Sequence, residues 1–227
     1  MGLCSRTQAH CRLMKPPKSL SAQTKQVLTC LKRMYPDAHC ALNYRNPFEL
    51  LVATMLSSQC TDVRVNQVTA TLFETYPDPQ AFASAEPSAL EQAVRPTGFF
   101  RNKAAAIQAS SRILLAQHGG EVPRTLEYLT QLPGVGRKTA SVVMGNAFGA
   151  ADGVVVDTHV SRLSQRLGLS SQTTPEKIEQ DLMVLIPKAD WVLFPHLMIA
   201  HGRAICKARK PDCGHCLLND ICPSAMG

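Results

Sequence analysis

The 227-residue sequence has no long apolar run. The longest stretch without Asp, Glu, Lys or Arg covers residues 139–151, only 13 positions, whereas a membrane-spanning helix needs roughly 20 apolar residues. The first 20 residues lack the apolar segment of a signal peptide, so we expect neither a leader nor a membrane partner. Apolar residues make up 45% of the chain and charged residues 18%. This balance excludes intrinsic disorder and predicts one large or two small globular domains.

Acidic residues are absent from positions 1–36, which carry seven basic ones. The rest of the chain has 17 basic and 17 acidic residues, so the net charge of +7 comes from this first segment. Any nucleic-acid surface in the rest must therefore arise from local clusters of basic residues. We interpret residues 1–18 as a basic extension. A DNA-contacting tail, an organelle transit peptide and a solvated extension all remain open for it.

Strand signals are almost absent. The only strand-like run, residues 154–156, is too short to build a sheet. Helix signals recur instead: Asn46, Pro47 and Glu49 form an N-cap, a proline at the first helical position and a capping-box glutamate. Further helices are expected at residues 103–115, 139–148, 160–167 and 175–186, with glycines after several of them. The sequence therefore predicts an all-α protein of short helices.

The cysteines cannot form a fully paired disulfide framework, because there are nine of them. Four lie near the C-terminus with the spacing C-x6-C-x2-C-x5-C: Cys206, Cys213, Cys216 and Cys222. Zinc usually takes two close pairs, and only Cys213 and Cys216 form one here. A loop with uneven gaps favours a cubane iron–sulfur cluster, with zinc as the alternative. Either metal implies a reducing compartment.

Residues 132–140, with the sequence LPGVGRKTA, are the most informative segment. Gly134 and Gly136 predict a tight turn that leaves backbone amides unshielded, with Val135 anchored in the core. A helix is expected to start directly after the turn, and amides at a helix N-terminus bind phosphate. An ordinary helix–helix connection is the alternative for two glycines alone. The segment is not a P-loop, whose lysine follows G-x-x-x-x-G directly.

Lys138 falls in the first turn of that expected helix. The helix dipole and the neighbouring Arg137 both disfavour its positive charge. A neutral amine is a nucleophile, whereas an ammonium only binds phosphate, and local chemistry leaves both roles open. Asp157 is expected to cap the helix that follows it. A carboxylate beside DNA would need a further purpose, such as stabilising a sugar cation or moving a proton.

From about residue 42 to residue 222, the sequence resembles the endonuclease III family of helix-hairpin-helix DNA glycosylases that carry an iron–sulfur cluster. The matching motifs are PFELL at residues 47–51, LSSQCTD at 56–62, GFFRNK at 98–103, LPGVGRKTA at 132–140, VDTH at 156–159, HGR at 201–203 and KARKP at 207–211. The four-cysteine spacing is also that of the family. The resemblance implies a [4Fe-4S] cluster held by Cys206, Cys213, Cys216 and Cys222.

The resemblance also implies roles for individual residues. Lys138 matches the nucleophilic lysine and Asp157 the catalytic aspartate. Gln59 lies in the loop that fills the gap left by a flipped nucleotide, and Phe99 in a second wedge loop where an aliphatic residue is common. Thr130 stands where many members have Glu. The expected DNA contacts are Gln59, Phe99, Gly134, Val135, Gly136, Arg137, Lys207, Arg209 and Lys210.

The fold implied by the resemblance has two helical domains with a DNA-binding groove between them. Residues 19–40 and 151–227 are expected to form the cluster domain, and residues 41–150 a six-helix domain containing the hairpin. The implied activity is that of a bifunctional DNA glycosylase and AP lyase in base excision repair. Its implied partner is double-stranded DNA with damaged pyrimidines or abasic sites. A monomer is expected, in the cytoplasm and nucleoid of a bacterium, or in a nucleus or mitochondrion.

Three alternatives remain at this point. A monofunctional adenine glycosylase of the same superfamily lacks the nucleophilic lysine and usually has an additional C-terminal domain, so Lys138 and the end at Gly227 argue against it. A non-catalytic DNA-binding module would have no use for Asp157 or the wedge loops. A zinc-stabilised interaction domain would be colourless.

Overall fold

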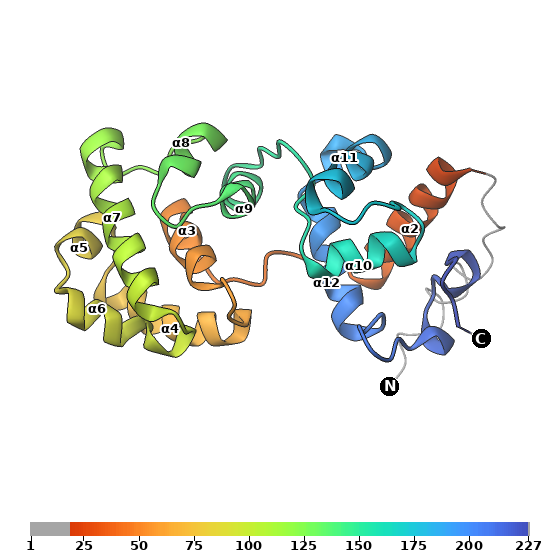
Figure 1. Cartoon of the computed structure of the whole chain (residues 1–227), viewed down its shortest axis with the longest axis horizontal. Helices are drawn as coiled ribbons and strands as arrows, with labels where there is room; N and C mark the ends of the chain where they lie inside the picture. The colour runs from red at the N-terminus through yellow and green to blue at the C-terminus, as the bar shows by residue number, and fades with distance from the viewer. Residues whose placement is uncertain (1–18, 227) are drawn as a thin grey trace. The chain divides into compact units, whose positions relative to one another are not determined.

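The computed structural model describes residues 19–226, and the basic extension of residues 1–18 lies outside them. Within the described part the chain is helical and contains no strand (Figure 1), which confirms the predicted all-α class. A search of these residues for an apolar helix of membrane-spanning length finds none.

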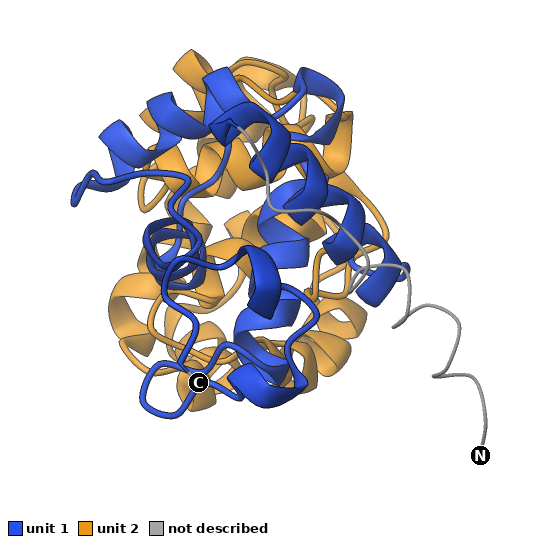
Figure 2. Cartoon of the chain, turned by 90° about the vertical axis from the view of Figure 1, so that its right-hand side faces the viewer, with its two compact units in different colours: residues 1–39, 153–227 blue, residues 40–152 orange. Residues whose placement is uncertain are grey.

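The chain divides into two compact units (Figure 2). Of the described residues, unit 1 combines 19–39 and 153–226, and unit 2 is the continuous segment of residues 40–152. These limits differ by one and two residues from the domain boundaries expected from the resemblance. Each unit has its own buried apolar cluster, so each is a separate folding core.

Unit 2 is built from seven α-helices and one 3-10 helix, all within the described residues. The seven include the six-residue helices α5 and α8, so the number is one more than the resemblance implies. Their bounds are α3 Pro47–Leu56, α4 Asp62–Thr75, α5 Pro79–Ser84, α6 Pro87–Val94, η1 Arg95–Thr97, α7 Phe100–His118, α8 Leu126–Gln131 and α9 Arg137–Phe148. The long α7 packs against α5 and α6, and α3 packs against α9, α4 and α7.

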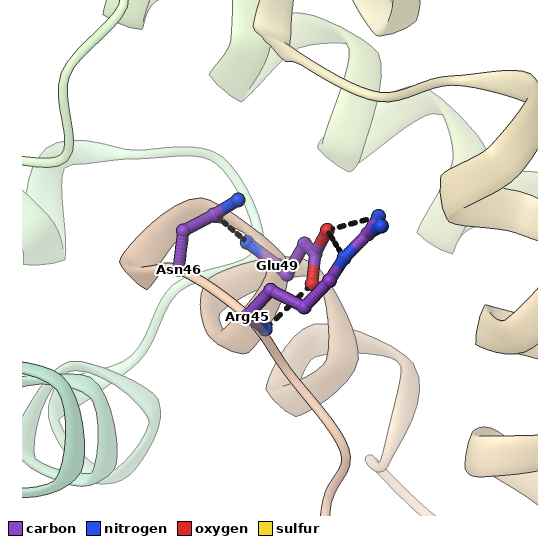
Figure 3. Close-up of polar contacts among 3 residues, drawn as sticks. All are labelled: Arg45, Asn46 and Glu49. Atoms are coloured by element: carbon purple, nitrogen blue, oxygen red, sulfur yellow. Dashed lines mark hydrogen bonds and ion pairs between the residues drawn. The ribbon is translucent and has the colours of Figure 1, made fainter.

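Helix α3 is the centre of unit 2, because every residue after Pro47 is buried. It begins where the sequence predicts. The Asn46 side chain accepts a hydrogen bond from the Glu49 amide at 2.9 Å (Figure 3). Glu49 is only 2% exposed and accepts from the Arg45 amide at 2.7 Å and from Arg45 Nε at 2.8 Å. The buried carboxylate is thus compensated, and the entry of the chain into α3 is fixed.

Unit 1 is formed by α2 Leu20–Met34, α10 Thr158–Arg166, α11 Pro175–Leu185, η2 Lys188–Asp190, α12 Leu193–Ala204, η3 Cys213–His215 and η4 Asn219–Ile221. Helix α12 packs against α10 and α2. Its approach to α10 requires Gly202. A Cβ atom there would lie 2.6 Å from His159 Nδ1 and 2.9 Å from Arg162 Nη2. The close packing of these two helices places the C-terminal end of α12, which leads into Cys206, beside α10.

Candidate functional site

The hairpin of residues 132–136 joins α8 to α9 in unit 2. Val135 is buried in the core cluster, as predicted, and its amide donates to the Leu132 carbonyl at 3.1 Å. Gly134 has a φ of +75°, and an added Cβ would lie 2.8 Å from Ala106 Cβ. A side chain at this position would therefore meet both backbone strain and steric conflict. Because the Val135 amide already donates to an acceptor, only the amides that follow it are available to donate to a phosphate.

The first turn of α9 has no side-chain cap. Gly136 is its N-cap residue and has no side chain to accept from the helix amides. In seven other helices of the described residues the N-cap side chain accepts a hydrogen bond from a backbone amide of the first turn: α2, α3, α4, α5, α6, α8 and α10. Arg137 and Lys138, the first two residues of α9, are exposed. Unshielded amides and two basic side chains thus share one helix end, a combination suited to an anion. On α8, the Thr130 hydroxyl only donates to the carbonyls of its own helix.

Gln59 and Phe99 share an unusual backbone conformation. Within residues 19–226 they are the two residues other than glycine with positive φ, 54° for Gln59 and 48° for Phe99. Gln59 lies in the loop between α3 and α4, and Phe99 directly precedes α7. Both side chains are exposed, and Phe99 is 64% exposed despite its apolar ring. A strained backbone beneath an exposed side chain is typical of functional loops.

Asp157 belongs to unit 1 and caps α10, as predicted. Its Oδ1 accepts from the Val160 amide at 2.8 Å, and the side chain is half-buried. Among the described residues no other group donates to this carboxylate, so Oδ2 is available for chemistry. Lys138 belongs to unit 2, so the two candidate catalytic residues come from different units.

The four C-terminal cysteines line one cavity of about 270 Å³ in unit 1. Its other walls include Leu163, Arg166, His201 and Ile205. The volume far exceeds the roughly 30 Å³ of one water molecule. Four thiols around a space of this size leave room for a polynuclear cluster.

The electrostatics of the cavity call for a positive centre. Burial, and then the charges of Cys222, Cys206 and Cys213, raise the pKa of the Cys216 thiol to about 11. Burial and the charges of Cys206 and Cys213 likewise raise the pKa of Cys222, which the Arg166 guanidinium partly offsets. Four thiolates are costly here on their own, and iron ions would remove that cost.

Two arginines of α10 hold the segment that follows α12. Arg162 Nη2 donates to the Cys206 carbonyl at 3.1 Å. Arg166 donates to Cys206 Sγ at 3.3 Å and to the carbonyls of Lys207 and Ala208 at 2.8 Å each. Lys207, Arg209 and Lys210 are exposed on this segment, as expected for phosphate contacts. The sequence signal for this support was the spacing of Arg162 and Arg166, one helical turn apart, which sequence reasoning passed over.

Sequence reasoning also missed a second group of residues that supports the cysteine cavity. The Tyr35 hydroxyl lies 3.0 Å from His201 Nδ1, and His201 Nε2 lies 3.6 Å from Cys216 Sγ. Burial lowers the pKa of His201 to about 4 and raises that of Tyr35 to about 12. At neutral pH the ring is therefore uncharged and the phenol protonated. We assign the phenol as donor to Nδ1, which leaves the proton of Nε2 directed to the sulfur.

Comparison with known proteins first defines the class. Residues 52–188 match the family model of HhH-GPD superfamily base excision DNA repair proteins. Residues 206–222, which begin and end at the outer two of the four cysteines, match the iron–sulfur binding domain of endonuclease III.

Individual relatives narrow this to one family. Endonuclease III of Synechocystis sp. is 53% identical over 214 residues, covering 94% of this chain and 98% of that protein. Two solved structures, a non-covalent endonuclease III–DNA complex and a trapped endonuclease III–DNA covalent intermediate, are 46% identical. They superpose with TM-scores of 0.83 and 0.82, covering 89% of this chain and 96% of each of theirs. The chain belongs to the endonuclease III family. It is a base excision repair DNA glycosylase and AP lyase with an iron–sulfur cluster.

Proposed function

We propose that Lys138 is the nucleophile and Asp157 its charged partner in the excision of oxidised or ring-saturated pyrimidines from duplex DNA and the cleavage of abasic sites. The observation that carries this proposal is the exposed amine in the uncapped first turn of α9, directly after the glycine hairpin. Amides of that turn bind a backbone phosphate without reading sequence, and the amine next to them reaches the sugar.

Chemistry begins once the target nucleotide has left the base stack. Extrusion costs a few kcal/mol, and less for a damaged base, which contributes to selectivity. Gln59 and Phe99 enter the space that the nucleotide vacates and kink the duplex. The exposed side chains of these two residues, held on strained loops, support this role.

The Lys138 amine then attacks C1′ and the glycosidic bond breaks, so the base departs with the bonding electrons and takes up a proton. Asp157 stabilises the positive charge that develops on the sugar, or accepts a proton from the amine. Opening of the sugar ring gives an iminium between Lys138 and C1′. This Schiff base acidifies the C2′ proton. Loss of that proton breaks the C3′–O3′ bond, which releases the 3′ strand with its 5′-phosphate and leaves an unsaturated Schiff base on Lys138. Water then hydrolyses this imine, which frees the Lys138 amine and leaves an unsaturated aldehyde on the DNA.

Cys206, Cys213, Cys216 and Cys222 would hold the cluster in the cavity of unit 1. A bound cubane supplies a rigid core for the loop and takes no part in the bond changes at the sugar. With four thiolates it carries a charge of −2, so the charge of the loaded chain falls from +7 to about +5. Lys207, Arg209 and Lys210 offset this charge locally and contact phosphates. Each lost contact should flatten the slope of log affinity against log salt by about 0.9.

A lesion panel tests the substrate assignment. Duplexes carrying a ring-saturated pyrimidine, an abasic site, an undamaged pyrimidine or adenine opposite guanine are incubated with the holoprotein, and base release and strand nicking are measured separately. We expect release and nicking together on the first duplex and nicking on the second. Release of adenine without nicking would instead establish a monofunctional adenine glycosylase.

A further inference from the structure

Lys103 is an unusual lysine, because its side chain is buried and only 8% of the residue is exposed. Its Nζ donates to the Leu56 carbonyl and to the Thr97 carbonyl, each at 2.8 Å. Within residues 19–226 no carboxylate pairs with this ammonium. Burial lowers the pKa of Lys103, an effect that the charge of Cys60 partly offsets. Keeping a lysine here is costly, so its two hydrogen bonds should serve a purpose.

Both acceptors lie at the ends of helices. Leu56 is the last residue of α3, and Thr97 is the last residue of η1. Carbonyls at such ends lack an intrahelical donor and carry the negative end of the helix dipole, so an ammonium is a favourable partner. One side chain thereby joins two chain segments that are about 40 positions apart in the sequence.

These two segments lead directly into the loops that carry Gln59 and Phe99, residues 57–61 and 98–99, which we name the wedge loops. Gln59 follows Leu56 by three positions, and Phe99 follows Thr97 by two. The Lys103 amide also donates to the Phe99 carbonyl at 3.1 Å. Lys103 therefore contacts one wedge loop directly through its backbone. Through its side chain it contacts the residue that immediately precedes each wedge loop.

We propose that Lys103 is a positioning residue that fixes the two wedge loops relative to one another, so that Gln59 and Phe99 enter the duplex together. A left-handed backbone at residues other than glycine persists only where the surroundings impose it. Gln59 and Phe99 have this backbone, and each follows closely after one of the two carbonyls that Lys103 joins. The loops are preorganised before DNA binds, which lowers the cost of ordering them in the complex. This inference rests on the proposed function, since it assigns Lys103 to the flipping step and not to the chemistry.

The test compares substrates that do and do not require flipping. Lys103→Met conserves volume but cannot donate to either carbonyl. We expect excision of a ring-saturated pyrimidine from duplex DNA to fall between about ten- and a hundred-fold, the scale of a small misplacement of a positioning group. Nicking of an abasic site in single-stranded DNA should stay at the wild-type rate. The fluorescence of a 2-aminopurine placed next to the lesion rises when that base unstacks, and this rise should be smaller with Lys103→Met than with the wild type.

Gln108→Met is the matched control. Gln108 is also buried on α7, and its Nε2 donates to the carbonyls of Ala85 at 2.7 Å and Phe82 at 3.4 Å, away from the wedge loops. This variant should lose stability without a change in the ratio of duplex to single-strand activity. In a Phe99→Ala background, Lys103→Met should add much less than it does alone, because both changes then act on the same step.

Three outcomes would overturn the inference. Lys103→Met could excise the lesion from duplex DNA at the wild-type rate, or it could lose the same factor in activity on the duplex and the single-stranded substrate. The Gln108→Met control could also change the ratio of duplex to single-strand activity as much as Lys103→Met does. If Lys103→Met does not fold, Lys103→Gln serves instead, since its shorter amide cannot span both carbonyls, and the same fall in the ratio is required. Wild-type protein that nicks neither the single-stranded abasic substrate nor an abasic-site duplex would contradict the proposed function itself and not the role of Lys103.

Discussion

The phenol oxygen of Tyr35 lies 3.0 Å from Nδ1 of His201, and this contact connects the end of α2 to the wall of the cysteine cavity. His201 is 2% exposed, so the hydrogen bond is shielded from water. The other ring nitrogen of His201, Nε2, contacts the sulfur of Cys216. The N-terminal segment of unit 1 thus helps to hold a residue next to a proposed cluster ligand, far away in the sequence.

Tyr35→Phe should weaken both the fold and the retention of the cluster. The change leaves Nδ1 of His201 buried without a partner, which costs about 1–3 kcal/mol. We expect a lower free energy of unfolding in urea and faster loss of the absorbance near about 400 nm that marks the cluster. Tyr44→Phe is the control, because its hydroxyl donates to the Asn146 carbonyl at 3.1 Å in unit 2. Equal bleaching rates for the two variants would refute the connection to Cys216.

The two hairpin glycines should separate folding from phosphate binding. Gly134→Ala places a methyl 2.8 Å from Ala106 Cβ at positive φ, so the free energy of unfolding should fall by about 2 kcal/mol or more. Gly136→Ala meets nothing within 4 Å and has a φ of −84°. Its stability should stay within about 0.5 kcal/mol of wild type. Its affinity for abasic-site DNA should fall because the methyl stands beside the exposed amides. Wild-type affinity for Gly136→Ala would argue that these amides do not approach DNA.

Asp157→Asn should lose orders of magnitude in base release while the protein remains folded. An asparagine oxygen still accepts from the Val160 amide, so the cap survives, but the charge is lost. Asp78→Asn is the matched control, because Asp78 caps α5 with the same 2.8 Å contact to an amide three residues on. Both variants should unfold at nearly wild-type urea concentrations, and only the first should be inactive. An active Asp157→Asn would leave this residue with its structural role alone.

Local signals carried most of the fold prediction. Asn46, Pro47 and Glu49 start α3 where expected, because an N-cap and a proline act within a single turn. Helix α7 begins three residues before the predicted start, at Phe100, and extends three residues beyond the predicted end. The apolar spacing used to locate it is weak in its first turn, where Lys103 stands in a buried position.

The supports of the site could not be predicted in this way. A lone lysine in sequence is most often a surface residue, and nothing near Lys103 shows that its ammonium meets carbonyls of two distant segments. Tyr35 and His201 are 166 positions apart. Such contacts depend on the packing of helices that lie far apart in the sequence, and no local pattern encodes them. The motifs around Lys138, Asp157 and the cysteines could be recognised in the sequence because the residues that form each motif lie close together along the chain.

The central claim is that the Lys138 amine forms the covalent intermediate, and borohydride trapping tests it most directly. Reduction of the Schiff base to an amine joins protein and DNA permanently, and the wild type should give this product on an abasic-site duplex. Lys138→Gln should give none, yet bind the same duplex with nearly wild-type affinity because the hairpin amides remain. Arg137→Gln, the neighbouring control, should trap normally and bind more weakly. Trapping of Lys138→Gln at wild-type yield would contradict the account and assign the reaction to another amine.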